Sequence, residues 1–313
     1  RGRIPRPEVV SGPRAAGYRL VGRRLDYLLH LRPAEWPIMA AHTALGYLLA
    51  VGLADAAGEH LGRALAGLVV WVVCLNGGTL ALNSAFDRDE GDIAYLRDPP
   101  PPPRRLALFS LGLMAAGQVA ALALPPLFAV LYAVCFVLSV LYSVPPFRLK
   151  AVAGADWLIN MAGFGTLTPM AGWATTGRPV DPHTGILLLG FCPLFAALYP
   201  LTQLYQMEED ARRGDRTLAL MLGVRRSLDV ALAATAAAFL LFTWAAIRST
   251  WPPESAWWRW SLVLLALVAW CAVLVPWRRR AEHLRPPEHQ RRMYLALGAW
   301  AVTDLAVLLS WGT

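Results

Sequence analysis

Charged residues are scarce in this sequence. Only 16% of the 313 residues are Asp, Glu, Lys or Arg, whereas 57% are hydrophobic and the mean hydropathy is +0.44. This composition excludes secreted, fibrous and disordered proteins and is typical of a chain that crosses a membrane many times. Cysteine is also rare, and the four cysteines lie far apart without a CxxC pair, which argues against a disulfide framework or a structural metal site. The six histidines show no HExxH or similar spacing, so zinc catalysis is not expected.

Long apolar runs dominate the rest of the chain. A helix needs roughly 20 apolar residues to cross a hydrocarbon core of about 30 Å, and nine runs are long enough. They cover residues 37–54, 61–83, 106–124, 126–147, 157–175, 185–205, 227–247, 256–277 and 293–311. We therefore predict an all-α polytopic membrane protein with nine transmembrane helices in residues 37–313, preceded by a basic cytoplasmic arm of residues 1–36.

Lysine and arginine are unevenly distributed between the segments that join these runs. Alternate segments, beginning with the N-terminal arm, contain 25 of the 29 basic residues. Since cytoplasmic loops retain basic residues, the N-terminus is predicted to be cytoplasmic and the C-terminus outside, in the inner (plasma) membrane of a prokaryote. The net charge of +8 is then a topology signal and an attraction to anionic membrane lipids. The basic residues do not line one face, so no nucleic-acid partner is expected.

Nine of the 21 acidic residues lie in two short stretches on the predicted cytoplasmic side. The first stretch follows the second predicted helix. There Asn83 and Asp87 are four residues apart and share one face of a helix. Gly91 occupies the next position of that face, where the backbone can unwind and turn Asp89 or Asp92 toward the same point.

The second acidic stretch follows the sixth predicted helix. Gln206 and Asp210 are four residues apart, as are Tyr205 and Glu209. Carboxylates crowded at the mouth of a helical bundle repel one another and need a cation. Mg²⁺ prefers oxygen ligands and takes one or two carboxylates together with substrate phosphate. Two facing acidic clusters therefore predict a few Mg²⁺ ions that hold a diphosphate.

Basic residues near these stretches are candidates for contacts with the same phosphates. Arg148 and Lys150 follow the fourth predicted helix, and Arg104 follows a stiff five-proline segment. Arg32 precedes the first predicted helix and either approaches the phosphates or anchors the chain at the lipid headgroups. The alternative for the acids is that each is a solvated loop residue that balances a nearby arginine.

One polar residue interrupts the second apolar run. Asn76 is followed by Gly77 and Gly78 in mid-helix. Small residues allow neighbouring membrane helices to approach closely, so we interpret this group as a packing patch. The alternative is a polar group that faces an acceptor molecule.

Taken together, these motifs resemble those of the UbiA superfamily of intramembrane prenyltransferases. That family has an NxxxDxxxD motif after its second helix and a DxxxD motif after its sixth. The segment LYSVPPFRLK at 141–150 is similar to the family's segment between helices four and five, and GDRTLA at 214–219 is similar to GKRTLA. The sequence departs from the family pattern at three positions. Gly91 replaces an acid of the first motif, Gln206 replaces the first residue of the second motif, and Asp215 replaces a lysine.

The resemblance implies nine helices around a central cavity open to lipid, and Mg²⁺-dependent transfer of an isoprenyl group from its diphosphate. The implied metal ligands are Asn83, Asp87, Asp89, Asp92, Gln206, Glu209 and Asp210. The implied diphosphate-binding residues are Arg148, Lys150, Arg104, Arg32, Tyr205 and Gln206. The implied catalytic residues are Asn83, Asp87, Asp210, Arg148 and Lys150.

Three functions remain open at this point. The first is prenyl transfer to an aromatic, quinone-precursor, tetrapyrrole or lipid acceptor. The second is cyclisation of the isoprenyl chain by one of its own double bonds. The third is a non-enzymatic carrier of an amphipathic anion, because polar groups within membranes also mark transport pathways. The sequence determines neither the acceptor, nor the chain length, nor the oligomeric state.

Overall fold

The computed structural model describes residues 13–87, 93, 96 and 98–313. In this part of the chain all regular elements are helical, and β-structure is limited to two isolated bridges. The predicted all-α class is therefore confirmed. The elements are α1 (Pro13–Val21), η2 (Gly22–Arg24), α2 (Leu25–His30), α3 (Trp36–Val51), α4 (Leu61–Val69), η3 (Val70–Gly77), α5 (Gly78–Asp87), α6 (Leu106–Ala121), α7 (Pro126–Ser143), η4 (Leu149–Ala151), α8 (Ala155–Asn160), η5 (Met161–Leu167), α9 (Thr168–Ala174), α10 (Pro182–Leu189), α11 (Phe191–Gln203), α12 (Met207–Arg213), α13 (Leu218–Arg248), α14 (Pro253–Arg279), η6 (Ala281–His283) and α15 (Pro286–Trp311).

Six helical segments in the described chain are long and apolar enough to cross a membrane. They are Leu61–Asp87, Pro126–Ser143, Pro182–Gln203, Leu218–Arg248, Pro253–Arg279 and Pro286–Trp311. Two further apolar helices, α3 and α6, are shorter. The predicted run 157–175 falls on α8, η5 and α9. The protein is therefore an integral membrane protein, while nine crossings and their orientation stay predictions.

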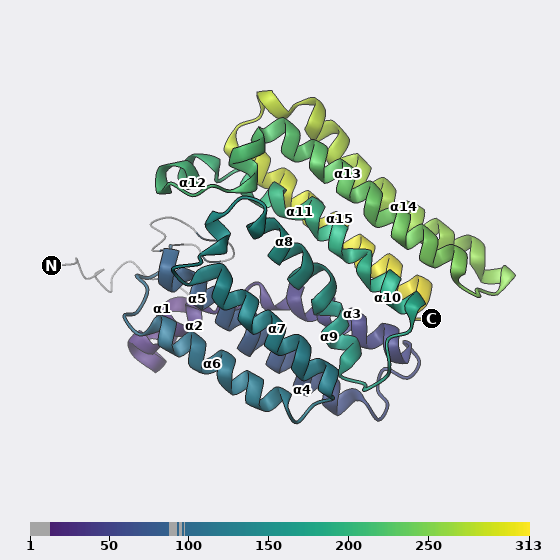
Figure 1. Ribbon diagram of the computed structural model, residues 1–313, viewed down its shortest axis with the longest axis horizontal. Coiled ribbons are helices and arrows are strands. Elements are labelled where there is room, and N and C mark those ends of the chain that lie inside the picture. The colour runs from purple at the N-terminus through teal and green to yellow at the C-terminus, as the bar shows by residue number, and fades with distance from the viewer. Residues whose placement is uncertain (1–12, 88–92, 94–95, 97) are drawn as a thin grey trace.

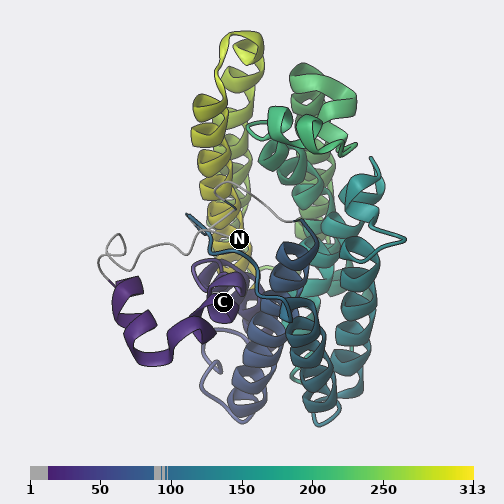
Figure 2. The ribbon, with the colours of Figure 1, turned by 90° about the vertical axis from the view of Figure 1, so that its left-hand side faces the viewer.

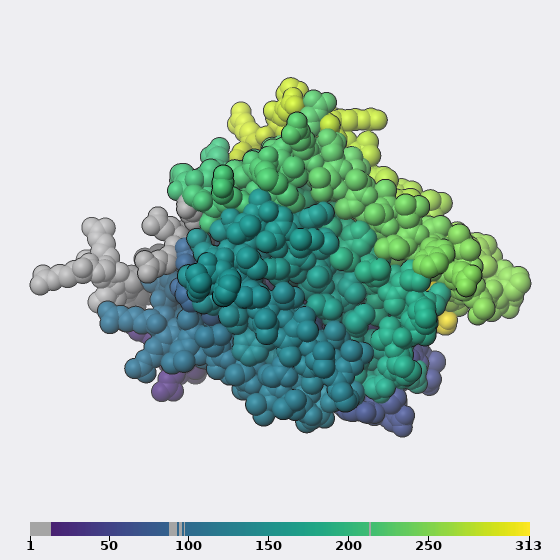
Figure 3. Space-filling view, viewed as in Figure 1, coloured from purple at the N-terminus to yellow at the C-terminus, as the bar shows by residue number. Residues whose placement is uncertain are grey.

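The helices form two halves that lie side by side. Helices α1 to α9 make up one half, coloured purple to teal, and α10 to α15 make up the other, coloured green to yellow (Figures 1 and 2). Each half has its own hydrophobic core: Trp71 and Phe128 are buried in the first, Phe191 and Trp270 in the second. The space-filling view shows the two halves in continuous contact on the face presented there (Figure 3).

Helices α3 and α9 cross with their backbones in contact, and two glycines make this approach possible. A Cβ atom on Gly46 would overlap the carbonyl oxygen of Pro169, and one on Gly172 would overlap the carbonyl oxygen of Thr43. Small residues commonly permit such close crossings in membrane proteins. The crossing fixes the position of the helical stretch formed by α8, η5 and α9.

Replacing Gly46 or Gly172 by alanine is expected to destabilise the protein by about 1–3 kcal/mol, because the added methyl group forces the backbones apart. Gly298 on α15 is the matched control, since no atom lies within 4 Å of a Cβ built there. Its alanine variant should be as stable as the parent, or more stable by up to about 1 kcal/mol. Unfolding in a denaturing detergent measures all three variants. Equal stability of all three would show that the crossing tolerates a wider separation.

A buried histidine connects α3 to α15 and to η5. Pro169 has no N–H to donate to the carbonyl of Gly165, four residues earlier. The Nε2 atom of His42 lies 3.2 Å from that oxygen, and its Nδ1 atom lies 3.1 Å from Oδ1 of Asp304. The His42–Asp304 pair thus joins the two halves of the protein.

The elements that carry the predicted acidic motifs gather at one end of the bundle. The C-terminal end of α5 lies with α1, α2 and α12 at one end, and the C-terminus of the chain lies at the other (Figure 1). The described residues Asp87 and Asp210 of the two predicted acidic stretches therefore lie toward the same end.

Candidate functional site

Two loops meet beside the end of α5 and bring the predicted motifs together. Val152 forms a parallel β-bridge with Arg216, which holds the segment after α7 against the segment before α13. Arg148 adopts a left-handed backbone conformation with φ 37° just before η4. This turn lets the Arg148 side chain reach both α5 and the loop before α13.

A polar cavity of about 170 Å³ lies between these segments. Six of the 14 lining residues carry a formal charge, and most of the others carry hydroxyl or amide groups. The lining residues are Arg32, Asn83, Asp87, Ile93, Tyr142, Lys150, Tyr199, Thr202, Gln203, Gln206, Glu209, Asp210, Asp215 and Thr217. Seven of the residues predicted from the sequence line this one cavity: Arg32, Asn83, Asp87, Lys150, Gln206, Glu209 and Asp210.

Lys150, the only lysine in the sequence, contacts both motif residues of α5, Asn83 and Asp87. Its Nζ donates to Oδ1 of Asn83 at 2.6 Å and to Oδ1 of Asp87. The Lys150 and Asp87 side chains are only 9% and 14% exposed, so they form a nearly buried ion pair. Water screens such a pair weakly, and removing one partner leaves the other charge uncompensated.

Arg148 connects the same carboxylate to the second loop. Its Nη2 lies 3.4 Å from Oδ1 of Asp87 and 3.3 Å from Oδ1 of Asp215. Two cations and two acids therefore alternate along this wall of the cavity. The charge is nearly balanced within the wall, which permits it to be buried.

Arg32 also lines the cavity and contacts α5. It is 6% exposed, and its Nη2 donates to Oγ of Ser84 at 3.2 Å. Desolvation raises the pKa of the nearby Glu35 to about 7, and the guanidinium of Arg32 opposes this shift. Below this pH the Glu35 carboxyl is neutral and does not compete with an anionic ligand for Arg32.

Five predicted site residues are not among those that line the polar cavity. Arg148 lies beside it, where it contacts Asp87 and Asp215. Arg104 is exposed. Tyr205 packs against the hydrophobic core of the C-terminal half. Asp89 and Asp92 lie outside the described residues.

A buried acid fixes the helices around this cavity. Asp156, at the start of α8, accepts hydrogen bonds from Gln203 Nε2 at 2.8 Å and from the Gly154 amide at 2.9 Å. Gln203 Oε1 in turn accepts from the Ala219 amide at 3.1 Å. The start of α8, the end of α11 and the start of α13 are thereby joined.

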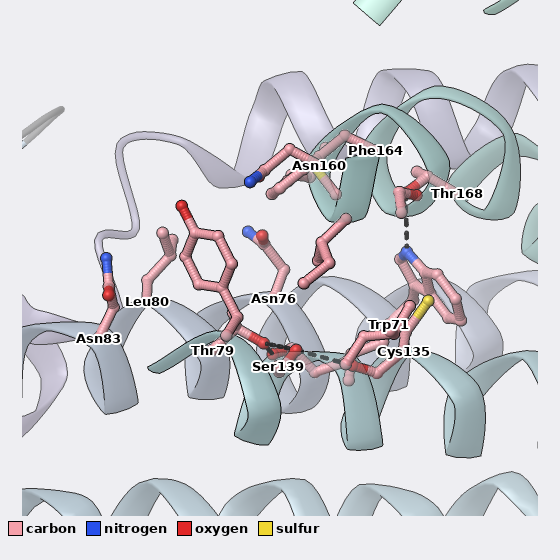
Figure 4. Close-up of a pocket in the computed structure, with 16 residues that line it drawn as sticks. Trp71, Asn76, Thr79, Leu80, Asn83, Cys135, Ser139, Asn160, Phe164 and Thr168 are labelled. Atoms are coloured by element: carbon pink, nitrogen blue, oxygen red, sulfur yellow. Dashed lines mark hydrogen bonds between the residues drawn. The ribbon is translucent and has the colours of Figure 1, made fainter. Parts of the chain in front are cut away.

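A second cavity, of about 180 Å³, continues from the polar one toward the middle of the bundle. Asn83 and Tyr142 line both cavities. Beyond them the walls are mainly apolar and aromatic, with Trp71 and Phe164 among the lining residues (Figure 4). A charged compartment and an apolar compartment thus meet at two residues.

Comparison with known proteins agrees with this geometry. A sequence model of the UbiA prenyltransferase family matches residues 40–298. The chain belongs to this family. The resemblance inferred from the motifs is therefore confirmed. No curated protein sequence matches the chain significantly.

Solved structures of UbiA proteins have the same fold. A UbiA homolog from Archaeoglobus fulgidus bound to GPP and Mg²⁺ is 18% identical, with a TM-score of 0.67 over 92% of this chain and 98% of that one. The same homolog bound to DMAPP and Mg²⁺ is 18% identical, with a TM-score of 0.65 over 91% and 99%. A digeranylgeranylglyceryl phosphate synthase is 16% identical, with a TM-score of 0.67 over 91% and 97%.

Within this UbiA protein, three of the cavity-lining residues that sequence reasoning missed belong to one helix. Tyr199, Thr202 and Gln203 all come from the end of α11. The Tyr199 hydroxyl lies 2.9 Å from that of Tyr142. A signal was available, because Tyr199, Gln203 and Gln206 follow one another at spacings of four and three and so share one helix face.

Proposed function

We propose that this UbiA protein transfers an isoprenyl group from an isoprenyl diphosphate to an acceptor within the membrane, in a reaction that depends on Mg²⁺. The observation that carries the proposal is the junction of a charged cavity and an apolar cavity at Asn83 and Tyr142. An isoprenyl diphosphate has the same division between a charged head and a hydrocarbon tail. The relatives from Archaeoglobus fulgidus that bind GPP or DMAPP with Mg²⁺ support this substrate class.

The oxygen ligands around the polar cavity fit Mg²⁺. Asn83 and Asp87 face it from α5, and Gln206, Glu209 and Asp210 face it from the beginning of α12. In the described chain no group of three or more His, Cys, Asp or Glu residues forms a complete metal site. This agrees with ions that are shared between one or two carboxylates and the substrate phosphates. Bound Mg²⁺ supplies positive charge that stabilises the leaving diphosphate.

The proposed ligand set extends beyond the cavity lining. Asp89 and Asp92 remain proposed Mg²⁺ ligands from the stretch outside the described residues. Arg104 and Tyr205 remain proposed diphosphate contacts, which they would make after a bound substrate had drawn them toward the cavity.

The protein's own residues account for the remaining parts of the reaction. Lys150, Arg148 and Arg32 place three positive charges where the diphosphate would lie. The bond between C1 of the chain and the diphosphate oxygen breaks, and its electron pair stays with the diphosphate. A nucleophilic atom of the acceptor then bonds to C1, and the proton on that atom passes to water. Trp71 and Phe164 line the apolar cavity, where they stabilise positive charge on the allylic chain and exclude water.

Release of diphosphate from geranyl diphosphate tests the proposal. The purified full-length protein is incubated with Mg²⁺ and geranyl diphosphate, alone and with an aromatic, a quinone-precursor, a tetrapyrrole or a lipid acceptor in turn. Prenyl transfer predicts release that depends on one of these acceptors. Release without an acceptor, together with a hydrocarbon product, would instead show cyclisation. Binding without any release would show a carrier and would overturn the enzymatic assignment.

We further propose that the polar cavity faces the cytoplasm from the inner membrane of a prokaryote. The support is the distribution of basic residues, which favours the segments on the side of both acidic motifs. Isoprenyl chains and lipid acceptors would then reach the apolar cavity from the bilayer. The diphosphate head would enter from the cytoplasmic side.

A further inference from the structure

The side-chain amide nitrogen of Asn76 is buried and has no hydrogen-bond partner within the described part of the chain. The Asn76 side chain is 4% exposed, and its Nδ2 makes no hydrogen bond there. A carboxamide has two N–H donors and one acceptor oxygen. Leaving such a donor unpaired in an apolar interior is unfavourable, so most buried amides in proteins are bonded.

The other polar groups in the apolar cavity already have partners. The hydroxyls of Thr79, Ser139 and Thr168 donate to backbone carbonyls of their own helices, and Asn160 donates to the carbonyl of Asp156. Figure 4 shows the amides of Asn76 and Asn160 facing each other across the cavity, from η3 and α8. Among the described residues that line this cavity, Asn76 is therefore the one whose buried side-chain N–H group has no protein partner.

The local backbone holds Asn76 in this orientation. It lies in η3, a π-helical stretch, and the opposite wall is formed partly by η5, which is also π-helical. π-helical turns are rare and frequently occur at functional sites. Gly77 and Gly78 pack against Leu31 and Met114 behind the cavity. The packing interpretation of this patch thus holds for the two glycines, whereas Asn76 points the other way.

We propose that Asn76 donates a hydrogen bond to a hydroxyl or carbonyl oxygen of the prenyl acceptor, which makes the acceptor a compact, neutral, oxygen-bearing molecule. This inference rests on the proposed function. We place the first carbons of the isoprenyl chain at the Asn83 end of the apolar cavity, with the rest of the chain extending toward the bilayer, and the acceptor at the Asn76 end. An isoprenyl tail at the Asn76 end has no oxygen and would leave the amide unpaired. A cavity of about 150 Å³ is large enough to bind a benzene ring, and this one measures about 180 Å³. Asn76 lies seven residues before Asn83, or about 10 Å along a helix, so an acceptor held there presents its opposite edge to the departing diphosphate.

A pair of isosteric probes tests this assignment in the purified full-length protein with Mg²⁺. 2-Naphthol and 2-methylnaphthalene differ by a hydroxyl in place of a methyl group. Their dissociation constants are obtained from the rise in melting temperature with probe concentration, in one detergent. The parent protein should prefer 2-naphthol. Asn76→Leu, which keeps the side-chain shape without the N–H groups, should bind 2-naphthol roughly tenfold more weakly, or by about 1.4 kcal/mol, and bind 2-methylnaphthalene as before.

Gln118→Leu is the matched control, because it removes a partly buried amide from α6 that does not line the cavity. It should keep the preference for 2-naphthol. The assignment is overturned if the parent shows no preference, if it fails to bind 2-naphthol, or if Asn76→Leu keeps the full preference.

Stabilisation by geranyl diphosphate with Mg²⁺ is measured in parallel on the same samples. This stabilisation should be the same in the parent and in Asn76→Leu. If geranyl diphosphate with Mg²⁺ did not stabilise the parent, the proposed function would be contradicted, and the probe result would stand alone. Stabilisation of the parent, together with an unchanged 2-naphthol preference in Asn76→Leu, would contradict only the role of Asn76.

Discussion

Asp210→Asn is expected to lower the Mg²⁺-dependent release of diphosphate from geranyl diphosphate by at least about a hundredfold. Asp210 lies in the first turn of α12, is 5% exposed and lines the polar cavity. Asparagine has nearly the same shape but no charge. The variant should therefore bind Mg²⁺ more weakly and stabilise the leaving diphosphate less. Initial rates at several Mg²⁺ concentrations measure the loss and show whether more Mg²⁺ restores part of the rate.

The control for this prediction lies on the same helix turn. Glu208 also belongs to the first turn of α12, but it is exposed and does not line the cavity. Glu208→Gln removes one negative charge from the same helix end and should keep the rate within about twofold. Equal losses in the two variants would mean that the charge of α12 matters only for the helix itself. A parental rate in Asp210→Asn would refute the proposal that the second acidic stretch binds Mg²⁺.

Lys150→Met is expected to lower the free energy of unfolding by about 3 kcal/mol when Mg²⁺ is absent. The substitution keeps most of the side-chain volume but leaves the carboxylate of Asp87 without its ammonium partner. Asp87→Asn should destabilise the protein for the converse reason. The double variant should be more stable than the sum of the two losses predicts, by about 1–3 kcal/mol, because it buries neither charge alone. Unfolding in a denaturing detergent gives all four values of the cycle.

An exposed ion pair provides the control for this cycle. Arg278 Nε lies 2.5 Å from Oδ1 of Asp229, with side chains that are 23% and 51% exposed. Arg278→Met should cost less than about 1 kcal/mol, because water screens this pair. Mg²⁺ should also stabilise Lys150→Met more than the parent, since the ion can replace the missing charge beside Asp87. Strict additivity of Lys150→Met and Asp87→Asn would show that the two side chains do not interact in the protein.

The neighbours within one helix face could be predicted because they depend only on local geometry. A spacing of four residues puts Asn83 beside Asp87 in any α-helix, and both side chains indeed contact Lys150. The same rule explains why Gln206 and Asp210 line one cavity. The run 157–175 was predicted as one helix, whereas Pro169 lies within it and the structure has a π-helical stretch just before this proline.

Contacts between distant segments could not be derived in this way. Helices α8 to α12 separate Asp215 from Arg148 in the sequence. A single β-bridge between Val152 and Arg216 brings the two residues together. Arg104 has the same charge as Arg148 and an equally basic neighbourhood, yet it is exposed. Charge and proximity in the sequence do not specify which way a loop turns.

The sequence by itself determined that the chain lies in a membrane, where its apolar helical runs fall and where the two acidic motifs lie. These features depend on hydrophobicity and helical periodicity, which act over short stretches of the chain. The tertiary structure decided that Lys150 contacts both Asn83 and Asp87, that the polar and apolar cavities meet at Asn83 and Tyr142, and that Asn76 faces the apolar cavity. These features depend on how helices cross and on where π-helical turns rotate a side chain. Packing between residues far apart in the chain sets both.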